Sequence, residues 1–476
     1  MSAAHQPVKR KLRNHAFRAV AAMVACAVAL AGPSAPAQAQ SRGGGGLPII
    51  RDAEIEQLLR DYTQPILRVA GLAQQNVRVV IINDRSFNAF VMDGHRIFVN
   101  AGALLESTTP NQLIGVLAHE TGHIAGGHLS KLRTELANAQ TISILAVLLG
   151  IGATIAASRA GTSVGGDPAA VALTAPQTVL QRTLLAYQRQ HEDQADRAGV
   201  KFLTASGQSA KGMYDTFKRM ADQQLFAARG ADPYYLSHPL ASERLSALAV
   251  IAKTQYWDKK DAPELQLRHD LMRAKLYGFL DGPGTIARRY SPSDQSLPAR
   301  YARAIATYRH ADLRSALGQI DSLLEAQPNN PYFHELKGQA LLESGRPTEA
   351  AAPLRRAATT APNPLLIQVM LAQALIATKD PKLADEAIAY LRQAVASDPD
   401  IADGYAQLAM AYGRKGDYAQ ADLASAQAAF ARGDLRTARQ LAARAKDRFP
   451  VGSPGWVKAD DIASYRPPAA ALRAGR

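Results

Sequence analysis

Cysteine and aromatic side chains are scarce in this 476-residue sequence. A single cysteine excludes a disulfide-stabilised scaffold and a zinc site built from cysteine ligands. Aromatic residues make up only 6% of the chain while alanine is abundant, which favours packed helices over a β-sandwich. An apolar fraction of 47% with 20% charged residues excludes a mostly disordered chain. At roughly 150 residues per domain, the length predicts about two or three domains.

Acidic side chains are absent from the first 39 residues, which have the three-part pattern of a secretory signal. Five basic residues lie between positions 9 and 18, an apolar run follows at 19–31, and small residues lead to an A-x-A site ending at Ala39. We expect cleavage after Ala39, with residues 40–46 as a flexible, glycine-rich linker. The apolar run is shorter than the roughly 20 residues that a spanning helix needs. An uncleaved anchor and lipidation at Cys26 are the alternatives.

Residues 47–270 have mixed patterning and are expected to form one domain. Residues 77–82 predict a strand, and residues 88–90 and 96–100 predict two more with a turn at Asp93-Gly94. We expect these strands to pair as a small antiparallel sheet. Helical periodicity dominates the remainder, so the fold class is mainly α with a minor β component (α+β).

Residues 297–450 contain an internal repeat. Prolines recur at positions 328, 362 and 399, at spacings of 34 and 37, and small residues such as Gly338 recur where two helices must approach closely. This pattern resembles the tetratricopeptide repeat, which implies an α-solenoid whose concave side binds a peptide or protein. We expect residues 271–296 to form a linking helical region and residues 451–476 a C-terminal tail.

The sequence His-Glu-Thr-Gly-His at residues 119–123 carries the clearest chemistry. A helix beginning after Thr109 would present His119 and His123 on one face, because they are four residues apart. Two neutral imidazoles at this spacing can ligate one Zn²⁺, and Glu120 beside them can act as general base on a metal-bound water. The alternative is a buried structural pair.

A third metal ligand must come from elsewhere in the chain. His128 misses the position used in metzincins by one residue and, on a continuing helix, points off the ligand face. A second predicted helix at residues 187–202 carries Glu192 and Asp196, four residues apart on one face. One of them can ligate zinc while the other accepts the remaining ring N–H of a zinc histidine. His191 points about 100° away and is expected to be exposed.

These motifs, followed by Ser-His-Pro-Leu at residues 237–240 and then Arg244, resemble the HtpX-type zinc metallopeptidases, relatives of the CAAX prenyl proteases. The signal and the C-terminal repeats make the chain most similar to the periplasmic BepA (YfgC)-type members. The resemblance implies a zincin fold of the gluzincin type with one Zn²⁺ per chain. It also implies these roles: metal ligands His119, His123 and Glu192, base Glu120, and supporting carboxylate Asp196.

The resemblance implies an endopeptidase of the bacterial periplasm that degrades misfolded or stalled outer-membrane proteins and assists their assembly. Its partners would be those substrates and, through the repeats, the outer-membrane assembly machinery. The alternative is a non-proteolytic chaperone or scaffold acting through its repeats, but a structural zinc site has no need of Glu120. The basic balance, with a pI near 9.8, does not indicate nucleic acid, because no basic-aromatic motif or nucleic-acid fold signature accompanies it.

Two further segments could lie near the active site. The resemblance places His238 near the metal, where it could hold the enzyme latent as a fourth ligand or donate to an oxyanion, and Arg244 could stabilise developing negative charge. From the residues alone, His238 is a turn residue and Arg244 a helix-surface residue. The apolar run 142–157 is short for a membrane span and predicts a buried helix, with a hairpin in peripheral contact with the membrane or a cover over the active site as the alternatives. Residues 158–177 read as a mobile loop.

Overall fold

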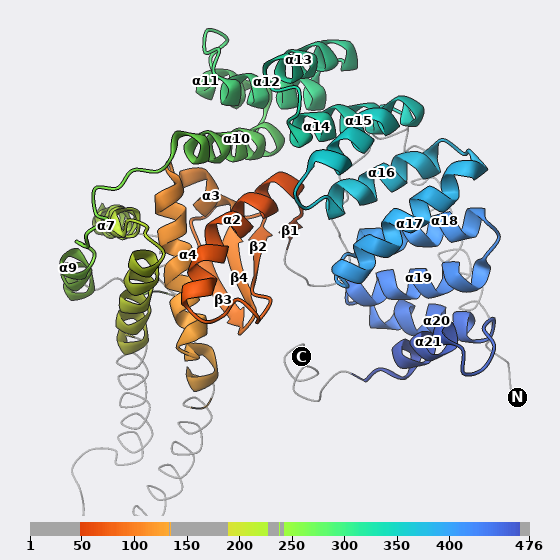
Figure 1. Cartoon of the computed structure of the whole chain (residues 1–476), viewed down its shortest axis with the longest axis horizontal. Coiled ribbons are helices and arrows are strands. Elements are labelled where there is room, and N and C mark those ends of the chain that lie inside the picture. Colours follow the sequence, from red (N-terminus) through yellow and green to blue (C-terminus); the bar gives the residue numbers. More distant parts are fainter. Residues whose placement is uncertain (1–47, 133, 135–188, 227–237, 239–241, 467–476) are drawn as a thin grey trace, which may run out of the picture. The chain divides into compact units, whose positions relative to one another are not determined.

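The computed structural model describes residues 48–132, 134, 189–226, 238 and 242–466, which are mostly helical (Figure 1). A four-stranded sheet lies in the N-terminal half, and helices follow one another from residue 263 to residue 464. The prediction of a mainly α fold with a small sheet is therefore confirmed. The signal, the linker, the apolar run 142–157 and the loop 158–177 all lie outside the described residues. Within the described ranges, no helix combines the length and apolar character needed to cross a membrane.

The sheet is mixed rather than antiparallel throughout. It consists of β1 (Ile49–Ile50), β2 (Arg78–Ile82), β3 (Ala89–Asp93) and β4 (Arg96–Asn100), in the order β1-β2-β4-β3. β3 and β4 form the predicted antiparallel hairpin, but β2 pairs with β4 in parallel, so the expected antiparallel pairing is wrong for these two strands. The cause is residues 83–88, which carry the chain to the sheet edge before the hairpin returns β4 beside β2.

Helix α4 (Pro110–Ala125) carries the histidine motif through the core of this half. It begins where the sequence predicts, because the Thr109 side chain accepts a hydrogen bond from the Gln112 backbone N–H and Gln112 caps in return. α4 packs against β3 and against two other helices, α2 (Ala53–Val69) and α7 (Lys211–Phe226). Its residues from Leu113 to Gly122 are buried, so surrounding elements fix the position of the helix.

Two shorter helices and one unlabelled helix complete the surroundings of α4. α3 (Ala101–Glu106) follows directly from β4, and α9 (Ser242–Ile251) packs against α7. Residues 189–205 form a helix that contains the acidic pair predicted from the sequence. A Cβ added at Gly122 would lie 2.7 Å from the Ala195 carbonyl oxygen, so glycine allows α4 and this helix to touch through their backbones.

The C-terminal half is a succession of antiparallel helix pairs that begins after α10 (Pro263–Leu280) and α11 (Pro283–Arg289). Its helices are α12 (Leu297–His310), α13 (Leu313–Ala326), α14 (Pro331–Glu343), α15 (Pro347–Thr360), α16 (Leu365–Ala377), α17 (Pro381–Ser397), α18 (Ala402–Arg414), α19 (Tyr418–Ala431), α20 (Leu435–Lys446) and α21 (Pro454–Ser464). The small residues lie where two helices approach closely, as the sequence predicts. A Cβ at Gly338 would lie 2.4 Å from the Leu354 Cγ, so only glycine allows α14 and α15 to pack this closely.

A buried ionic network joins α10 to α2 and to the repeats. The Lys275 Nζ lies 2.8 Å from Asp52, 3.3 Å from Glu54 and 3.6 Å from Glu335. Tyr301 of α12 donates a hydrogen bond of 3.0 Å to Glu54. Because these groups come from α2 and its cap, α10, α12 and α14, the network fixes how the four elements pack.

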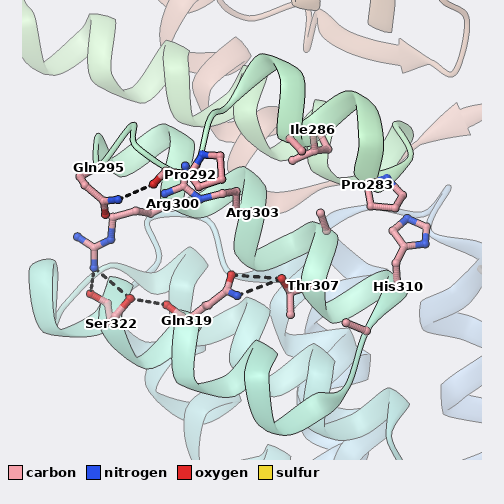
Figure 2. Close-up of a pocket in the computed structure, with 13 residues that line it drawn as sticks. Pro283, Ile286, Pro292, Gln295, Arg300, Arg303, Thr307, His310, Gln319 and Ser322 are labelled. Carbon is pink, nitrogen blue, oxygen red and sulfur yellow. Dashed lines mark hydrogen bonds between the residues drawn. The ribbon is translucent and has the colours of Figure 1, made fainter.

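A pocket of about 420 Å³ lies where α11 meets α12 and α13 (Figure 2). Pro283, Ile286 and Pro292 supply an apolar lining, and Arg300 and Arg303 add two cationic groups. Both guanidinium groups are oriented by neutral partners, since they donate to backbone carbonyls of Ser322, Tyr290 and Ser291. The pocket is therefore apolar in part and positively charged.

Candidate metal centre

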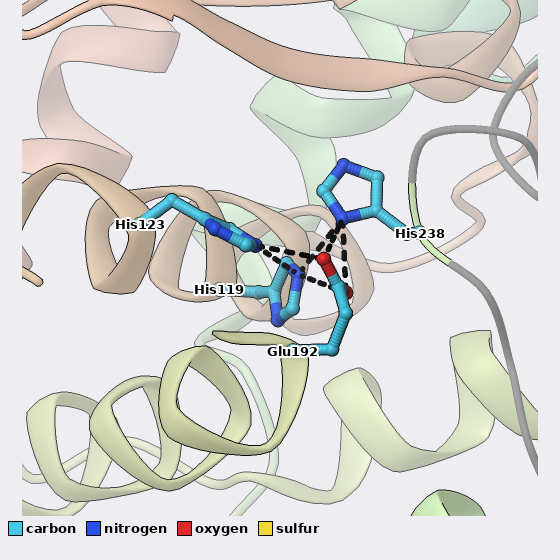
Figure 3. Close-up of side chains that lie close together, drawn as sticks. All are labelled: His119, His123, Glu192 and His238. Atoms are coloured by element: carbon cyan, nitrogen blue, oxygen red, sulfur yellow. Dashed lines mark hydrogen bonds and ion pairs between the residues drawn. The ribbon is translucent and has the colours of Figure 1, made fainter. Parts of the chain in front are cut away.

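The two histidines of the α4 motif face each other across one helical turn (Figure 3). The His119 ring is fully buried, and its Nε2 lies 3.1 Å from the Nε2 of His123. The structure thus brings the two sequence-predicted histidines together through their Nε2 atoms. Phe217 of α7 packs edge-on against the His119 ring and holds its orientation.

Glu192 brings a carboxylate to the same point from the 189–205 helix. Its Oε2 lies 3.4 Å from the His119 Nε2, and its Oε1 lies 3.3 Å from the His123 Nε2. His238 joins them, with its Nδ1 3.0 Å from each Glu192 oxygen and 3.3 Å from the His119 Nε2. One donor atom from each of these four residues lies within 4.8 Å of all the others.

These distances fit one tetrahedral metal ion. For bonds of about 2.1 Å, the corners of a tetrahedron lie about 3.4 Å apart. The separations among His119, His123 and Glu192 are 3.1–3.4 Å. Imidazole nitrogens with one carboxylate are also ligands that Zn²⁺ takes in catalytic sites. The donor set and its spacing therefore fit zinc.

Asp196 and Arg244 surround the group of four. Asp196 Oδ1 accepts a hydrogen bond of 2.9 Å from His119 Nδ1, which leaves the His119 Nε2 lone pair directed at the other donors. Arg244 is buried, not on the helix surface, and contacts Asp196 at 2.5 Å and Glu192 at 2.8 Å. Burial raises the pKa of Asp196, but the charge and hydrogen bonds of Arg244, together with His119, outweigh burial and leave that pKa below its ordinary value.

The pKa values of the two motif histidines move in opposite directions. Burial lowers the pKa of His123, to about 3. Burial also acts on His119, but the hydrogen bonds to Asp196 and Glu192 outweigh it and raise that pKa to about 9. Burial opposes ionisation of Glu192 too, but His238 and the motif histidines hold its pKa well below the usual range.

Glu120 stands apart from this network. It is fully buried, and neither of its oxygens accepts a hydrogen bond from a described residue. Its Oε1 lies 3.4 Å from the His238 Nε2, so it borders the donor group without belonging to it. Burial raises its pKa. Burying a carboxylate without a hydrogen-bond donor costs free energy. Such a residue therefore indicates a functional role such as proton transfer.

Two histidines that the sequence argument set aside lie beside the centre. His128 is absent from the donor group, as expected, but the assumption of a continuing helix is wrong, because α4 ends at Ala125 and the chain turns at Gly126 and Gly127. The His128 Nδ1 consequently lies 3.1 Å from the Nδ1 of His123. His191, expected to be exposed, is 7% exposed and stacks on the His128 ring. The consecutive glycines were the signal that could have found this arrangement.

Comparison with known proteins shows which family models match this chain. Residues 51–252 match the model of peptidase family M48, and residues 301–364 match a tetratricopeptide repeat model. The chain thus has an M48 peptidase domain followed by tetratricopeptide repeats, and it is a metalloprotease.

Three relatives align with this chain over most of their own length. The chain is 24% identical over 415 residues to the Beta-barrel assembly-enhancing protease of Yersinia pestis, covering 85% of this chain and 82% of the relative. The Escherichia coli (strain K12) protein of the same name is 24% identical over 420 residues, covering 86% and 82%. Metalloprotease YcaL of the same strain is 26% identical over 189 residues, covering 38% of this chain and 67% of the relative.

Proposed function

We propose that this chain is a zinc-dependent endopeptidase of the periplasm that degrades misfolded or stalled outer-membrane proteins and assists their assembly. The observation that carries the proteolytic part is Glu120, a fully buried carboxylate beside a donor group that fits zinc. The printed name of the relatives, which refers to β-barrel assembly, supports the role in the outer membrane.

In this proposal each side chain has one task. His119, His123 and Glu192 hold the zinc, and Asp196 fixes the His119 ring through its Nδ1–H. When bound, zinc polarises the scissile carbonyl and acidifies a water. Glu120 takes the proton of the attacking water and passes it to the leaving amine.

Arg244 keeps Glu192 and Asp196 in place through its two ion pairs. Its guanidinium is engaged by both carboxylates, so we propose that it acts on the reaction through them. This differs from the expectation that it stabilises developing charge directly.

His238 is proposed as a fourth ligand that holds the resting enzyme latent. Its Nδ1 is part of the donor group and lies as close to Glu192 as the two motif histidines do. If His238 donated to an oxyanion instead, the donor group would consist of His119, His123 and Glu192 alone. Under latency, His238→Ala raises casein hydrolysis, whereas under an oxyanion role the same change abolishes it.

The location rests on the secretory pattern of residues 1–39, with cleavage after Ala39. N-terminal sequencing of the protein recovered from a periplasmic extract tests this directly, and a start at Met1 would contradict it. The apolar run 142–157 is proposed to make a peripheral membrane contact.

The repeats are proposed to bind substrates and outer-membrane assembly components. The pocket at the start of the repeats favours acidic segments, because Arg300, Arg303 and His310 line it and none of its lining residues is acidic. A non-proteolytic scaffold is the alternative function, and the repeats alone would suffice for it.

One experiment separates the enzyme from the scaffold. Residues 40–476 are purified, bound zinc is quantified, and casein hydrolysis is compared with that of Glu120→Gln. The matched control is Glu349→Gln, an exposed glutamate of α15 far along the repeats. We expect one zinc per chain and a low rate of casein hydrolysis, because His238 holds the enzyme latent, with that rate lost only in Glu120→Gln. A folded protein that takes up no zinc in zinc-replete buffer would leave only the scaffold.

If zinc binds but neither protein cleaves casein, the His238→Ala background decides. Latency predicts that hydrolysis then appears with Glu120 and is absent with Glu120→Gln. Zinc binding without hydrolysis in either background would contradict the proteolytic proposal.

A further inference from the structure

His128 lies in a chain of ring contacts that leads away from the candidate metal centre. Its ring is 4% exposed, with Nδ1 at 3.1 Å from the His123 Nδ1 and Nε2 at 3.2 Å from the Gln194 Oε1. The His191 ring stacks on it, with centroids 4.3 Å apart and planes 6° from parallel. Both ring nitrogens of His128 are thus engaged, and its plane is held from one side.

The contacts fix which nitrogen carries each proton. The His123 Nε2 faces the donor group, so as a metal ligand it presents a lone pair and the ring proton lies on Nδ1. That N–H points at the His128 Nδ1, which must therefore accept. The remaining His128 proton then lies on Nε2 and is donated to the Gln194 amide oxygen, which has no proton to return.

We propose that His128 is a positioning residue that holds His123 in the tautomer and ring orientation required for metal binding, with Gln194 fixing the tautomer of His128. Asp196 does the equivalent for His119, also through Nδ1. His119 therefore donates to a carboxylate, whereas His123 donates to an imidazole. The inference rests on the proposed zinc site and adds to it a residue outside the metal-ligand motif.

The sequence after the motif is built for this contact. α4 ends at Ala125, and Gly127 has a left-handed backbone with φ of 61°, which turns the chain back toward α4. A Cβ at Gly126 would lie 2.2 Å from the His128 Nε2, so any other residue there would displace the ring. The two glycines thus bring a buried imidazole back against a residue only five positions earlier.

The 189–205 helix supplies the ligand Glu192 and the two supporting residues Gln194 and Asp196. Glu192, Gln194 and Asp196 lie at alternate positions at the start of the 189–205 helix. Gln194 is on the exposed side of this helix, so the chain of hydrogen bonds from His123 ends at the protein surface. A substitution at Gln194 therefore reaches the proposed zinc site without disturbing the core.

The test measures zinc affinity of the mature chain by competition with a chromophoric chelator, together with the unfolding midpoint of each metal-free protein. We expect His128→Ala to weaken zinc binding about 10–100-fold, the usual cost of losing a partner of a metal ligand. His128→Asn retains an acceptor near the Nδ1 position, so we expect its zinc affinity to stay within about threefold of wild type. His334→Ala, a half-buried histidine of α14, is the control.

The outcomes separate this inference from the proposed function. If wild type binds no zinc, the proposed function fails. If wild type binds zinc and His128→Ala binds it equally well, only the positioning inference is overturned. Equal losses in His128→Ala and His128→Asn would likewise overturn it, because packing rather than an acceptor would then matter. If His128→Ala does not fold, Gln194→Ala decides: we expect weaker zinc binding, and unchanged affinity overturns the inference.

Discussion

Replacing Gly122 by alanine tests whether the close contact between α4 and the 189–205 helix builds the site. The added Cβ would lie 2.7 Å from the Ala195 carbonyl oxygen, whereas ordinary contact begins at 3.4 Å. The two backbones must therefore separate by about 0.7 Å, or the side of α4 must distort by as much. His119 and His123 lie on one helix and Glu192 on the other. A shift of this size exceeds the roughly 0.2 Å within which metal–ligand distances are held.

Two opposing energies set the size of the effect. Overpacking typically costs about 1–3 kcal/mol, and the better helix propensity of alanine returns about 0.8–1.0 kcal/mol. We expect the free energy of unfolding in urea to fall by up to about 2 kcal/mol, with zinc affinity reduced at least about tenfold. Gly318→Ala is the matched control, because it lies inside α13 with no atom within 4 Å of an added Cβ. Gly318→Ala should gain only the higher helix propensity of alanine, about 0.8–1.0 kcal/mol. Equal stability of the two variants, with wild-type zinc affinity in both, would refute the reasoning.

Three further changes test the buried charges. Lys275→Met leaves Glu54 and Glu335 buried without their cation, so we expect urea unfolding at pH 7 to show a loss of about 3–5 kcal/mol. Burial outweighs the lysine charge and raises the pKa of Glu335 to about 7. The contribution of Glu335 to the free energy of unfolding is therefore fully present below about pH 4.5 and is lost as the pH rises through about 7. Glu335→Gln should abolish this loss, and a wild-type pH profile in the variant would contradict the assignment. Asp196→Asn should weaken zinc binding about 10–100-fold in chelator competition, because His119 loses its charged acceptor.

Local patterns predicted the elements whose ends depend on nearby residues. The Thr109–Gln112 capping box sets the start of α4, and the strand at residues 96–100 has the bounds that its pattern indicates. The pairing of β2 with β4 was not predictable in this way. It depends on where residues 83–88 place the next strand, and a sequence pattern carries no information about which edge that strand joins.

In the candidate site, too, local patterns predicted which residues share a helix face but not which segments contact each other. Helical spacing alone indicates that His119 and His123 share a face, and that Glu192 and Asp196 do. Spacing does not indicate the contact of His128 with His123, because two glycines end α4 before His128 and turn the chain. It also fails for His191, since helix geometry gives the direction of a side chain but not the neighbour that covers it. Both errors concern contacts between separate segments.

The arrangement of charges explains how the donor group can exist before a metal binds. Glu120, Glu192 and Asp196 are three carboxylates buried at one place, which would be unfavourable without compensation. Arg244 pairs with two of them, while burial raises the pKa of the third, so the negative charge is offset in two different ways. Arg244 lies 48 residues from Asp196 in sequence, so the offset is complete only when these segments have folded together. Folding therefore assembles the donor group around one buried arginine, so the ligands of a metal ion would already be in place before it binds.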